Sequence, residues 1–345
     1  MLSKEKKLSY SALDNYFKCS FRYYMNNLLS LKENKDIPAG KIGNAFHKVL
    51  EDSFKENFDF ETSYQNEYAN QSNMVKFYLD KFKNVLVDII RINNENLAKS
   101  SLNQVLTEKK VIINYDEPFP IEFKGFVDKI LYYEEKGTTY VAIIDYKTSD
   151  ITLKLEQAKY GLSLQLPIYL YFIKHSSDFK KVEVCGFYLQ KLLPKNPKLA
   201  DGYEKNLLDT IKLQGYSNSS IATLSRFDPG FANSNLIKSM SLTKHSSFNR
   251  YAKTLSTDEM NKLAELVDFK VKEAISKIAD CDFDINPKML DGKNQSCNFC
   301  EFKECCFFKH DDLIYLNDEE KDDEDVDEDV DEEYEYYEES YGGDY

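Results

Sequence analysis

Apolar residues recur at helical spacing in two long stretches of the chain. Residues 73–99 and 257–280 carry an apolar side chain every three or four positions, which is typical of an amphipathic helix with one buried face. Ser256 or Thr257 stands where a capping side chain would begin the second of these helices. We therefore expect one long helix in the first third of the chain and another near its end.

Two shorter helices are expected ahead of the first long one. Residues 8–29 have apolar positions at helical spacing, with Ser9 or Ser11 as the N-cap. A second helix is expected over roughly 42–57. Helices therefore precede the strands in this chain.

A block rich in β-branched and aromatic residues follows. Residues 110–116 and 123–148 favour strands, 162–174 an apolar helix, and 182–190 a further strand. Residues 191–255 are polar and weakly patterned, and we expect loops and short helices there. The order helices, strands, helix, strand, helix predicts a mixed α/β fold.

The segment 123–148 predicts a hairpin that brings two carboxylates together. Lys136-Gly137 can form its two-residue loop, so facing residues have index numbers that sum to 273. Asp128 and Asp145 share that sum, which places them opposite each other. Lys147 follows two residues later and therefore leaves the same face of the strand as Asp145.

Facing carboxylates indicate a cation between them. Two such groups near a sheet interior repel unless a proton or a cation lies between them. Their hard oxygen atoms suit Mg²⁺ or Mn²⁺, which keep several waters for chemistry. A neighbouring lysine can orient such a water and stabilise charge on a phosphate. This arrangement is the minimum needed for metal-assisted hydrolysis of a phosphodiester.

The net charge divides unevenly along the chain. The 345 residues carry −14 overall, but residues 311–345 alone carry −18, so the body is mildly basic at +4. The tail is too polar to bury a core, and we expect it to be disordered. It is either a solubility tail or a nucleic-acid mimic that competes for a basic groove. Hydrophobic residues make up 42% of the whole chain, so residues 1–310 can form one large domain without disulfides.

Nothing in the sequence indicates a membrane or a secretory pathway. No run of 18 apolar residues is present, and the first ten residues contain no apolar signal segment. The expected compartment is the cytoplasm. Thiols stay reduced there, so clustered cysteines hold metal more often than they form disulfides.

The hairpin and its neighbours resemble a nuclease family. Residues 125–128 (GFVD) and 144–148 (IDYKT) are similar to the G-x-x-D and D-x-K elements of PD-(D/E)XK nucleases. Gly43 and His47, followed by Leu50-Glu51, resemble the helical histidine motif of the RecB-like branch. Residues 165–169 (QLPIY) resemble its Q-x-x-x-Y helix. Four elements in this order and spacing over about 125 residues are far more specific than a lone D-x-K.

The resemblance implies a restriction-endonuclease-like core, that is, a mixed β-sheet flanked by helices, with helical elaborations. It also implies a role for each matching residue. Lys147 is the catalytic lysine, while Gln165 and Tyr169 share a helix face and support the site and the DNA. Glu108, just ahead of the first strand, matches a family acidic position less securely. The implied metal residues are His47, Asp128, Asp145 and Tyr146.

The cysteines suggest a second metal centre. Three are clustered near the end of the chain, and Cys19 lies far upstream as a possible fourth ligand. Zinc is usually held by two clustered pairs, so three plus one fits an iron–sulfur cluster at least as well. Cys185 and Cys281 are interpreted as free thiols. The spacing of the clustered cysteines is C-x₂-C-x₅-C if the third is Cys306, or C-x₂-C-x₄-C if it is Cys305.

This cysteine arrangement resembles iron–sulfur RecB-like nucleases, including the nuclease domain of AddB-type helicase–nuclease subunits. The resemblance implies one 4Fe-4S cluster, with the family spacing selecting Cys306 over Cys305. The cluster would join chain positions nearly 280 residues apart and act as a staple rather than a catalyst. The implied ligands are Cys19, Cys297, Cys300 and Cys306.

The function expected from sequence is a Mg²⁺-dependent DNA nuclease, an exonuclease in DNA repair or recombination. DNA would be held mainly through its phosphates, with a separate helicase subunit as a possible partner. A CRISPR-associated RecB-like exonuclease remains an alternative within the superfamily. A non-catalytic DNA-binding scaffold of the same fold is a second alternative, which the intact Asp128, Asp145 and Lys147 disfavour.

Overall fold

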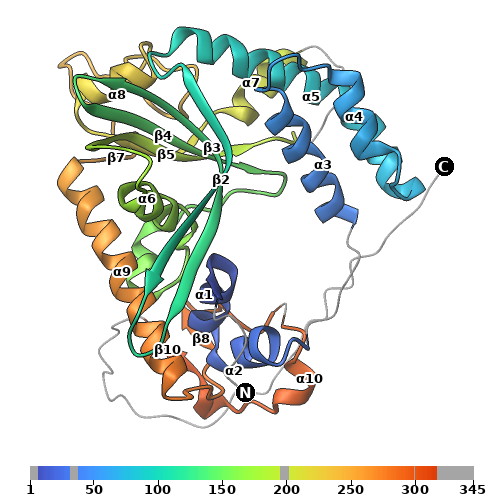
Figure 1. The fold of residues 1–345 in the computed structure, drawn as a ribbon, viewed down its shortest axis with the longest axis vertical. Helices are drawn as coiled ribbons and strands as arrows, with labels where there is room; N and C mark the ends of the chain where they lie inside the picture. The colour runs from blue at the N-terminus through green and yellow to red at the C-terminus, as the bar shows by residue number, and fades with distance from the viewer. Residues whose placement is uncertain (1–6, 32–37, 195–201, 299, 317–345) are drawn as a thin grey trace, which may run out of the picture.

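A computed structural model describes residues 7–31, 38–194, 202–298 and 300–316. Helices come first, a long antiparallel block of strands follows, and helices and short strands complete the chain (Figure 1). The elements are β1 (Lys7–Ser9), α1 (Tyr10–Lys18), α2 (Ser20–Tyr23), η1 (Tyr24–Leu28), α3 (Pro38–Asp52), α4 (Phe60–Tyr68), α5 (Asn73–Lys99), β2 (Gln104–Tyr115), β3 (Ile121–Glu135), β4 (Thr138–Lys147), η2 (Leu155–Tyr160), α6 (Gln165–His175), β5 (Val182–Lys191), α7 (Tyr203–Ile211), β6 (Gln214–Asn218), α8 (Ile221–Phe227), β7 (Thr254–Leu255), α9 (Thr257–Ala279), β8 (Lys288–Leu290), β9 (Lys293–Asn294), α10 (Lys303–Cys306), η3 (His310–Asp312) and β10 (Ile314–Tyr315).

The central hairpin has the predicted register. Seven pairs from Lys129–Ile144 to Glu135–Thr138 all sum to 273. Its two loop residues both have positive φ, 51° at Lys136 and 76° at Gly137, as a two-residue hairpin loop with the twist of its strands requires. The turn therefore sets which residues of β3 and β4 face each other.

The sheet forks along β3. The strand order is β1-β3-β4-β5-β6-β7, with β2 also paired to β3. On one side of β3, β2 runs along most of its length. On the other side, β1 pairs with residues 122–124 and β4 with residues 129–135. Residues 125–128 lie between these two partners, and residues 145–147 of β4 pair only with β5, which runs beside β4 from Thr139 to Lys147. This fork is the place where side chains of β3 and β4 can meet a ligand.

Two apolar layers cover the sheet. On one face, α6 and α9 pack with α1 over a core that includes Phe123, Val127 and Ile143. On the other face, α3, α5 and α8 pack over a core that includes Ala142 and Ile144 (Figure 1). Side chains of successive β4 residues therefore point into opposite layers, and because both layers are apolar this strand is apolar almost throughout. The mixed α/β fold expected from sequence is confirmed.

The long helices match their sequence patterns, and two short strands do not. The α5 helix spans 73–99 as predicted, and Ser256 caps α9 in a capping box with Glu259. Within 191–255, where loops and short helices were expected, β6 joins the sheet. Its sequence is polar because Ser217 and Asn218 are buried with hydrogen bonds to Tyr188 Oη and the Val184 carbonyl. Strand β1 was interpreted as the start of a helix.

The folded part continues past the boundary expected at residue 310. Strand β10 pairs in parallel with β8, so residues 314 and 315 belong to a small three-stranded sheet. The remainder of the tail expected to be disordered, residues 317–345, lies outside the described residues. Of the helices described, none has the length and apolar character needed to cross a bilayer.

Candidate active site at the fork of the sheet

The fork brings Asp128 to the backbone of β4. The register of the hairpin, extended by one pair, sets this residue opposite Asp145. Because β4 no longer pairs with β3 there, the Tyr146 N–H is free to donate to Asp128 Oδ2 at 2.8 Å. His47 Nδ1, from helix α3, lies 3.4 Å from the same oxygen. One carboxylate thus connects two strands and a helix.

Asp145 is held by the helix on the other layer and by its own strand. Its Oδ1 accepts hydrogen bonds from Gln165 Nε2 at 2.9 Å and from Tyr169 Oη at 3.0 Å. These two residues lie one turn apart on α6, and Gln165 also donates to the Tyr169 hydroxyl at 3.0 Å. Lys147 Nζ lies 2.6 Å from Asp145 Oδ2. The shared helix face and the shared strand face inferred from sequence are both present.

Glu108 joins the site from the third strand. The pairs on either side of it in β2 and β3 sum to 236, which sets Glu108 opposite Asp128. Its φ of 47° marks a local kink in β2. One ligand atom from each of His47, Glu108 and Asp128 lies within 4.8 Å of the others. The family resemblance placed Glu108 just ahead of the first strand, but it lies inside β2. Its position in the site depends on the pairing register of β2 and β3, which could not be read from the sequence.

Crowding of carboxylates perturbs the protonation of the site. Burial, and then the charge of Asp145, raise the pKa of Asp128 to about 8. Burial, followed by the charge of Glu51, also raises the pKa of Glu108. Burial lowers the pKa of His47, which favours the neutral imidazole that can bind a metal. The raised pKa values of Asp128 and Glu108 indicate that these buried acids lack sufficient neighbouring positive charge.

The glycine of the histidine motif allows α3 to approach the end of β4. A Cβ at Gly43 would lie 3.3 Å from Thr148 Oγ1, closer than ordinary van der Waals contact. The absence of a side chain therefore lets the helix lie against the D-x-K segment. His47, one turn further along α3, reaches Asp128 as a result.

The donor set fits a hard divalent cation. It offers an imidazole and two carboxylates that converge, with a third carboxylate beside them. Asp145 Oδ2 is buried and receives no hydrogen bond within the described part of the chain, although the Lys147 ammonium is close. A bound cation would satisfy such an oxygen. Tyr146 contributes its backbone, since its N–H is bonded to Asp128 and its side chain is buried in the second layer.

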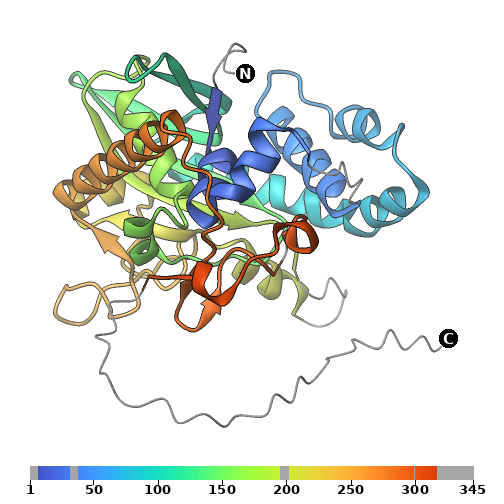
Figure 2. The ribbon, with the colours of Figure 1, turned by 90° about the horizontal axis from the view of Figure 1, so that it is seen from below.

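The chain ends meet at the cysteines. Helices α1 and α2 lie beside the segment from β8 to α10 (Figure 2). Ser20 N donates to Asn286 Oδ1 at 2.8 Å, and Phe21 N donates to the Asp284 carbonyl at 3.1 Å. The four cysteines expected as ligands line one small cavity there, whereas Cys305 does not line it and is exposed. The cavity cysteines are Cys19, Cys297, Cys300 and Cys306.

An arginine also faces this cysteine cavity. Arg22 lines it, and its Nε is buried with no hydrogen-bond partner among the described residues. Burial raises the pKa of both Cys297 and Cys300, so their thiols stay protonated unless a metal replaces the protons. An anionic group held by thiolates would supply the acceptor that Arg22 Nε lacks. The residues present therefore fit a cysteine-ligated metal group.

The glycine after η2 connects the cysteine end to the active-site helix. Gly161 has φ 79°, and a Cβ there would overlap the ring of Phe17 at 2.2 Å. Phe17 lies on α1, two residues before Cys19, and Gly161 lies four residues before Gln165. The ring therefore rests directly on the backbone that leads into α6.

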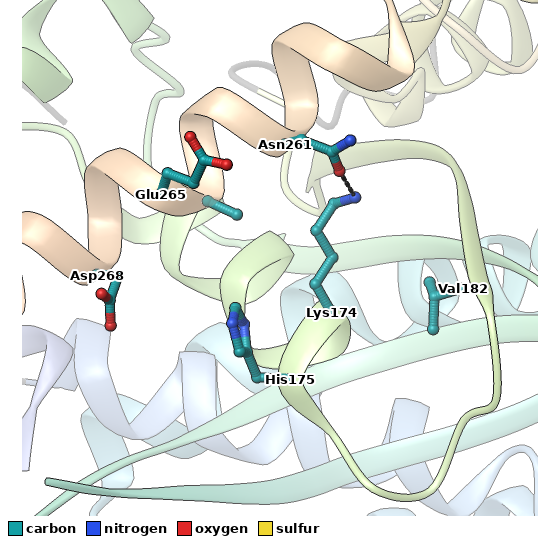
Figure 3. A pocket seen from close by; sticks show the side chains of 7 residues that line it. Lys174, His175, Val182, Asn261, Glu265 and Asp268 are labelled. Carbon is teal, nitrogen blue, oxygen red and sulfur yellow. Dashed lines mark hydrogen bonds between the residues drawn. The ribbon is translucent and has the colours of Figure 1, made fainter.

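A larger cavity lies away from both centres. It has a volume of about 480 Å³ and opens between the C-terminal end of α6 and α9. At the wall of this cavity, Lys174 Nζ donates to Asn261 Oδ1 at 2.5 Å. His175, Glu265 and Asp268 also line the cavity (Figure 3). Gln165 and Tyr169, at the other end of α6, do not line it. It therefore takes no part in the site at the fork.

Known proteins of similar sequence indicate the family of this chain. Residues 7–307 match the model of the PD-(D/E)XK nuclease superfamily. The chain is similar to proteins named as subunits of an ATP-dependent helicase/deoxyribonuclease: 24% identical over 352 residues in Caldanaerobacter subterraneus and 26% over 348 residues in Thermoanaerobacter sp.. The relative in Lactococcus lactis is 26% identical over 349 residues. These matches cover 90%, 88% and 91% of this chain but only 30% of each relative. The chain belongs to the PD-(D/E)XK nuclease superfamily.

Proposed function

We propose that this protein is a Mg²⁺- or Mn²⁺-dependent DNA nuclease that removes nucleotides from DNA ends. The observation that carries the proposal is the fork itself, where Asp128, Asp145 and Lys147 lie around one point. The acids and the lysine brought together at the fork disfavour a non-catalytic scaffold. A CRISPR-associated enzyme of the same superfamily would share this site, and the names of the relatives favour the present proposal over it.

Each residue of the site has a role in this proposal. His47, Glu108, Asp128 and Asp145 would hold the metal, which supplies a Lewis acid and a more acidic bound water when present. Lys147 would orient the attacking water and stabilise charge on the phosphate, because its ammonium is held beside Asp145 Oδ2. Gln165 and Tyr169 fix Asp145 through its other oxygen, so that only one oxygen faces the metal.

The cysteine cavity is proposed to hold a structural 4Fe-4S cluster. The cavity selects the same four cysteines as the family spacing, and the unpartnered Arg22 Nε supports an anionic occupant. Since none of these cysteines lies on β3 or β4, the cluster would act on folding rather than on chemistry.

A helicase subunit is the proposed partner. The relatives that carry "helicase" in their names are more than three times longer than the matching region. The nuclease would therefore act next to a motor that supplies it with a DNA end. A role in DNA repair or recombination follows from that arrangement.

The decisive experiment compares end-labelled linear DNA with circular DNA in Mg²⁺. We expect wild-type protein to degrade the linear DNA and to spare the circle. Degradation of both would show an endonuclease, whereas no cleavage of either under anaerobic conditions would support the scaffold instead.

A further inference from the structure

An exposed aromatic ring lies beside the fork. Phe126 occupies the middle of β3, yet its side chain is 50% exposed. Its neighbours Phe123 and Val127 are fully buried on the face that α6 covers. A Cβ at Gly125 would strike Phe172 of α6, so this side of the strand is tightly packed. Phe126 must therefore point away from α6, toward the face from which His47 reaches Asp128.

Three further side chains extend this exposed face. Lys110 pairs with Phe126 across the β2–β3 ladder, and Ile112 pairs with Lys124. Ile112 is 41% exposed, Lys110 is exposed and Lys124 is half-buried. Within the described ranges, neither lysine forms a side-chain ion pair. We call this set the Phe126 patch; its members are Lys110, Ile112, Lys124 and Phe126.

The Phe126 patch is continuous with the carboxylates of the active site. Two residues nearer the hairpin, Asp128 on β3 and Glu108 on β2 lie opposite each other by the register of the pairs on either side. Two residues of a strand span about 7 Å, so the ring lies within about two stacked base steps of the proposed metal site. Aromatic rings stack on bases, and lysines on either side can hold the backbone. A ring next to lysines and catalytic acids therefore has the composition of a single-strand track.

We propose that Phe126 stacks on an unpaired base next to the scissile phosphate and so positions a single strand along this face of β2 and β3. This inference rests on the proposed nuclease function. Bases in the interior of a duplex are stacked on both faces and cannot offer one to the ring, so only an unpaired base or a duplex end can. Lys110 and Lys124 hold the flanking phosphates, and the strand lies along the face of β2 and β3 that leads to Asp128.

The first experiment measures binding without cleavage. The full chain carries Lys147→Ala, and a labelled single-stranded oligonucleotide or a covalently closed circular duplex is titrated in Mg²⁺. Adding Phe126→Ala should weaken binding of the single strand roughly 5- to 150-fold, the range that loss of one base–aromatic stack gives. Binding of the duplex should change less than twofold. Phe126→Trp should restore the single-strand affinity, which a purely structural role would not allow.

A matched control separates stacking from the loss of any exposed ring. Phe269, on α9 in the opposite layer, is 61% exposed, and Phe269→Ala should leave both affinities unchanged. Lys110→Ala should weaken single strand and duplex alike and lower the salt slope by about one. Melting temperatures of all variants should match that of the parent, because these side chains are not in the core.

The outcomes distinguish this inference from the nuclease proposal. Equal losses on single strand and duplex would overturn base stacking and leave a backbone contact. No loss on either would remove DNA from the Phe126 patch and leave a protein partner as its occupant. If wild-type protein cleaves DNA but Phe126→Ala has unchanged KM for single strands, only the inference fails. If wild-type protein never cleaves but the stack is seen in binding, only the nuclease proposal fails.

Discussion

The fork of the sheet and the cysteine cavity are assembled in different ways. The fork is formed by long, paired strands. Its carboxylates lie on β2, β3 and β4, and Asp128 and Asp145 accept hydrogen bonds from neighbouring residues. The cysteine cavity joins the two ends of the chain through short helices and two-residue strands. Among the described residues, the hydrogen bonds of its cysteines are local, such as the bond from Cys306 Sγ to the Lys303 carbonyl at 3.6 Å. The difference implies that the fork keeps its shape without metal, whereas the cysteine cavity depends on what it holds.

The strongest test of the fork is removal of its lysine. Lys147→Ala should lower kcat about 10³-fold or more, since residues that act as one catalytic unit give losses of that order. The melting temperature should change little, because the Lys147 side chain is partly exposed. The measurement is cleavage of labelled linear DNA in Mg²⁺.

Asp145→Ala should have the same effect on cleavage. The matched control is Lys191→Ala, since Lys191 stands beside Lys147 on the adjacent strand and is paired with Asp150. That variant should keep activity within about tenfold of wild type. Comparable turnover in Lys147→Ala or Asp145→Ala would remove the proposed site.

Removing a cysteine from the cavity should lower stability and leave activity largely unchanged, the opposite of the effect expected at the fork. Cys19→Ala should bleach the broad absorbance near 400 nm expected of anaerobic protein, and should lower the free energy of unfolding by about 3–5 kcal/mol, the scale for a cross-link that closes a long loop. Activity per folded molecule should change far less. Absorbance and urea unfolding of anaerobic protein are the measurements.

Cys305→Ala is the sharpest control for the cluster. This cysteine neighbours Cys306 but does not line the cavity, so the colour and stability should both persist. Cys281→Ala should also leave the absorbance and the stability unchanged, because its thiol is exposed. Zinc without iron in anaerobic protein would eliminate the cluster while keeping the four-cysteine staple.

A smaller effect should follow from chelating the metal at the fork. The folded-state pKa of Asp128, about 8, exceeds its unfolded value near 4. The stability from its protonation is therefore complete below pH 4 and is lost as pH rises toward 8. In chelator, Asp128→Asn should then be more stable than wild type by about 1–3 kcal/mol at pH 9, and should lose this advantage at pH 4. Added Mg²⁺ should reverse the order at pH 9, whereas a wild-type advantage in chelator at pH 9 would contradict the crowding of acids.

The acidic tail should give the smallest change. Deletion of residues 317–345 spares β10 and removes most of a segment whose net charge is −18 from residue 311 onward. If the tail mimics nucleic acid, the truncated protein should bind DNA several-fold tighter at low salt and equally at high salt. Fluorescence anisotropy at two salt concentrations is sufficient. Equal binding at low salt would leave the solubility role.

The same contrast explains which features were predictable from sequence. The pairing of Asp128 with Asp145 depends on a two-residue loop, whose length determines the register. The pairing of Glu108 with Asp128 crosses a longer connection between β2 and β3, so index numbers could not supply it. The place of Gln165 and Tyr169 followed from helix periodicity, but their shared partner, Asp145, lies in another element.

Short strands were missed for a related reason. Strand β1 is three residues long, and β6 is polar with a glycine, so neither carries the alternation that indicates a strand. Their pairing partners provide what local sequence lacks. The exposure of Phe126 was likewise invisible, because an aromatic residue within a strand pattern is ordinarily counted as core.

The contact between Phe17 and Gly161 has a consequence for building chimeras from relatives. The ring occupies the space of a missing side chain, so the size of residue 17 and the size of residue 161 must be inherited together. A donor segment that supplies the N-terminal cysteine helix from another species would import its own residue at position 17. If the recipient retained its own turn before α6, residues 17 and 161 would collide when their side chains are together too large, and would leave a void when they are too small. A chimera should therefore take residues 8–29 and 155–169 from the same parent protein, although some 125 residues separate them in the chain.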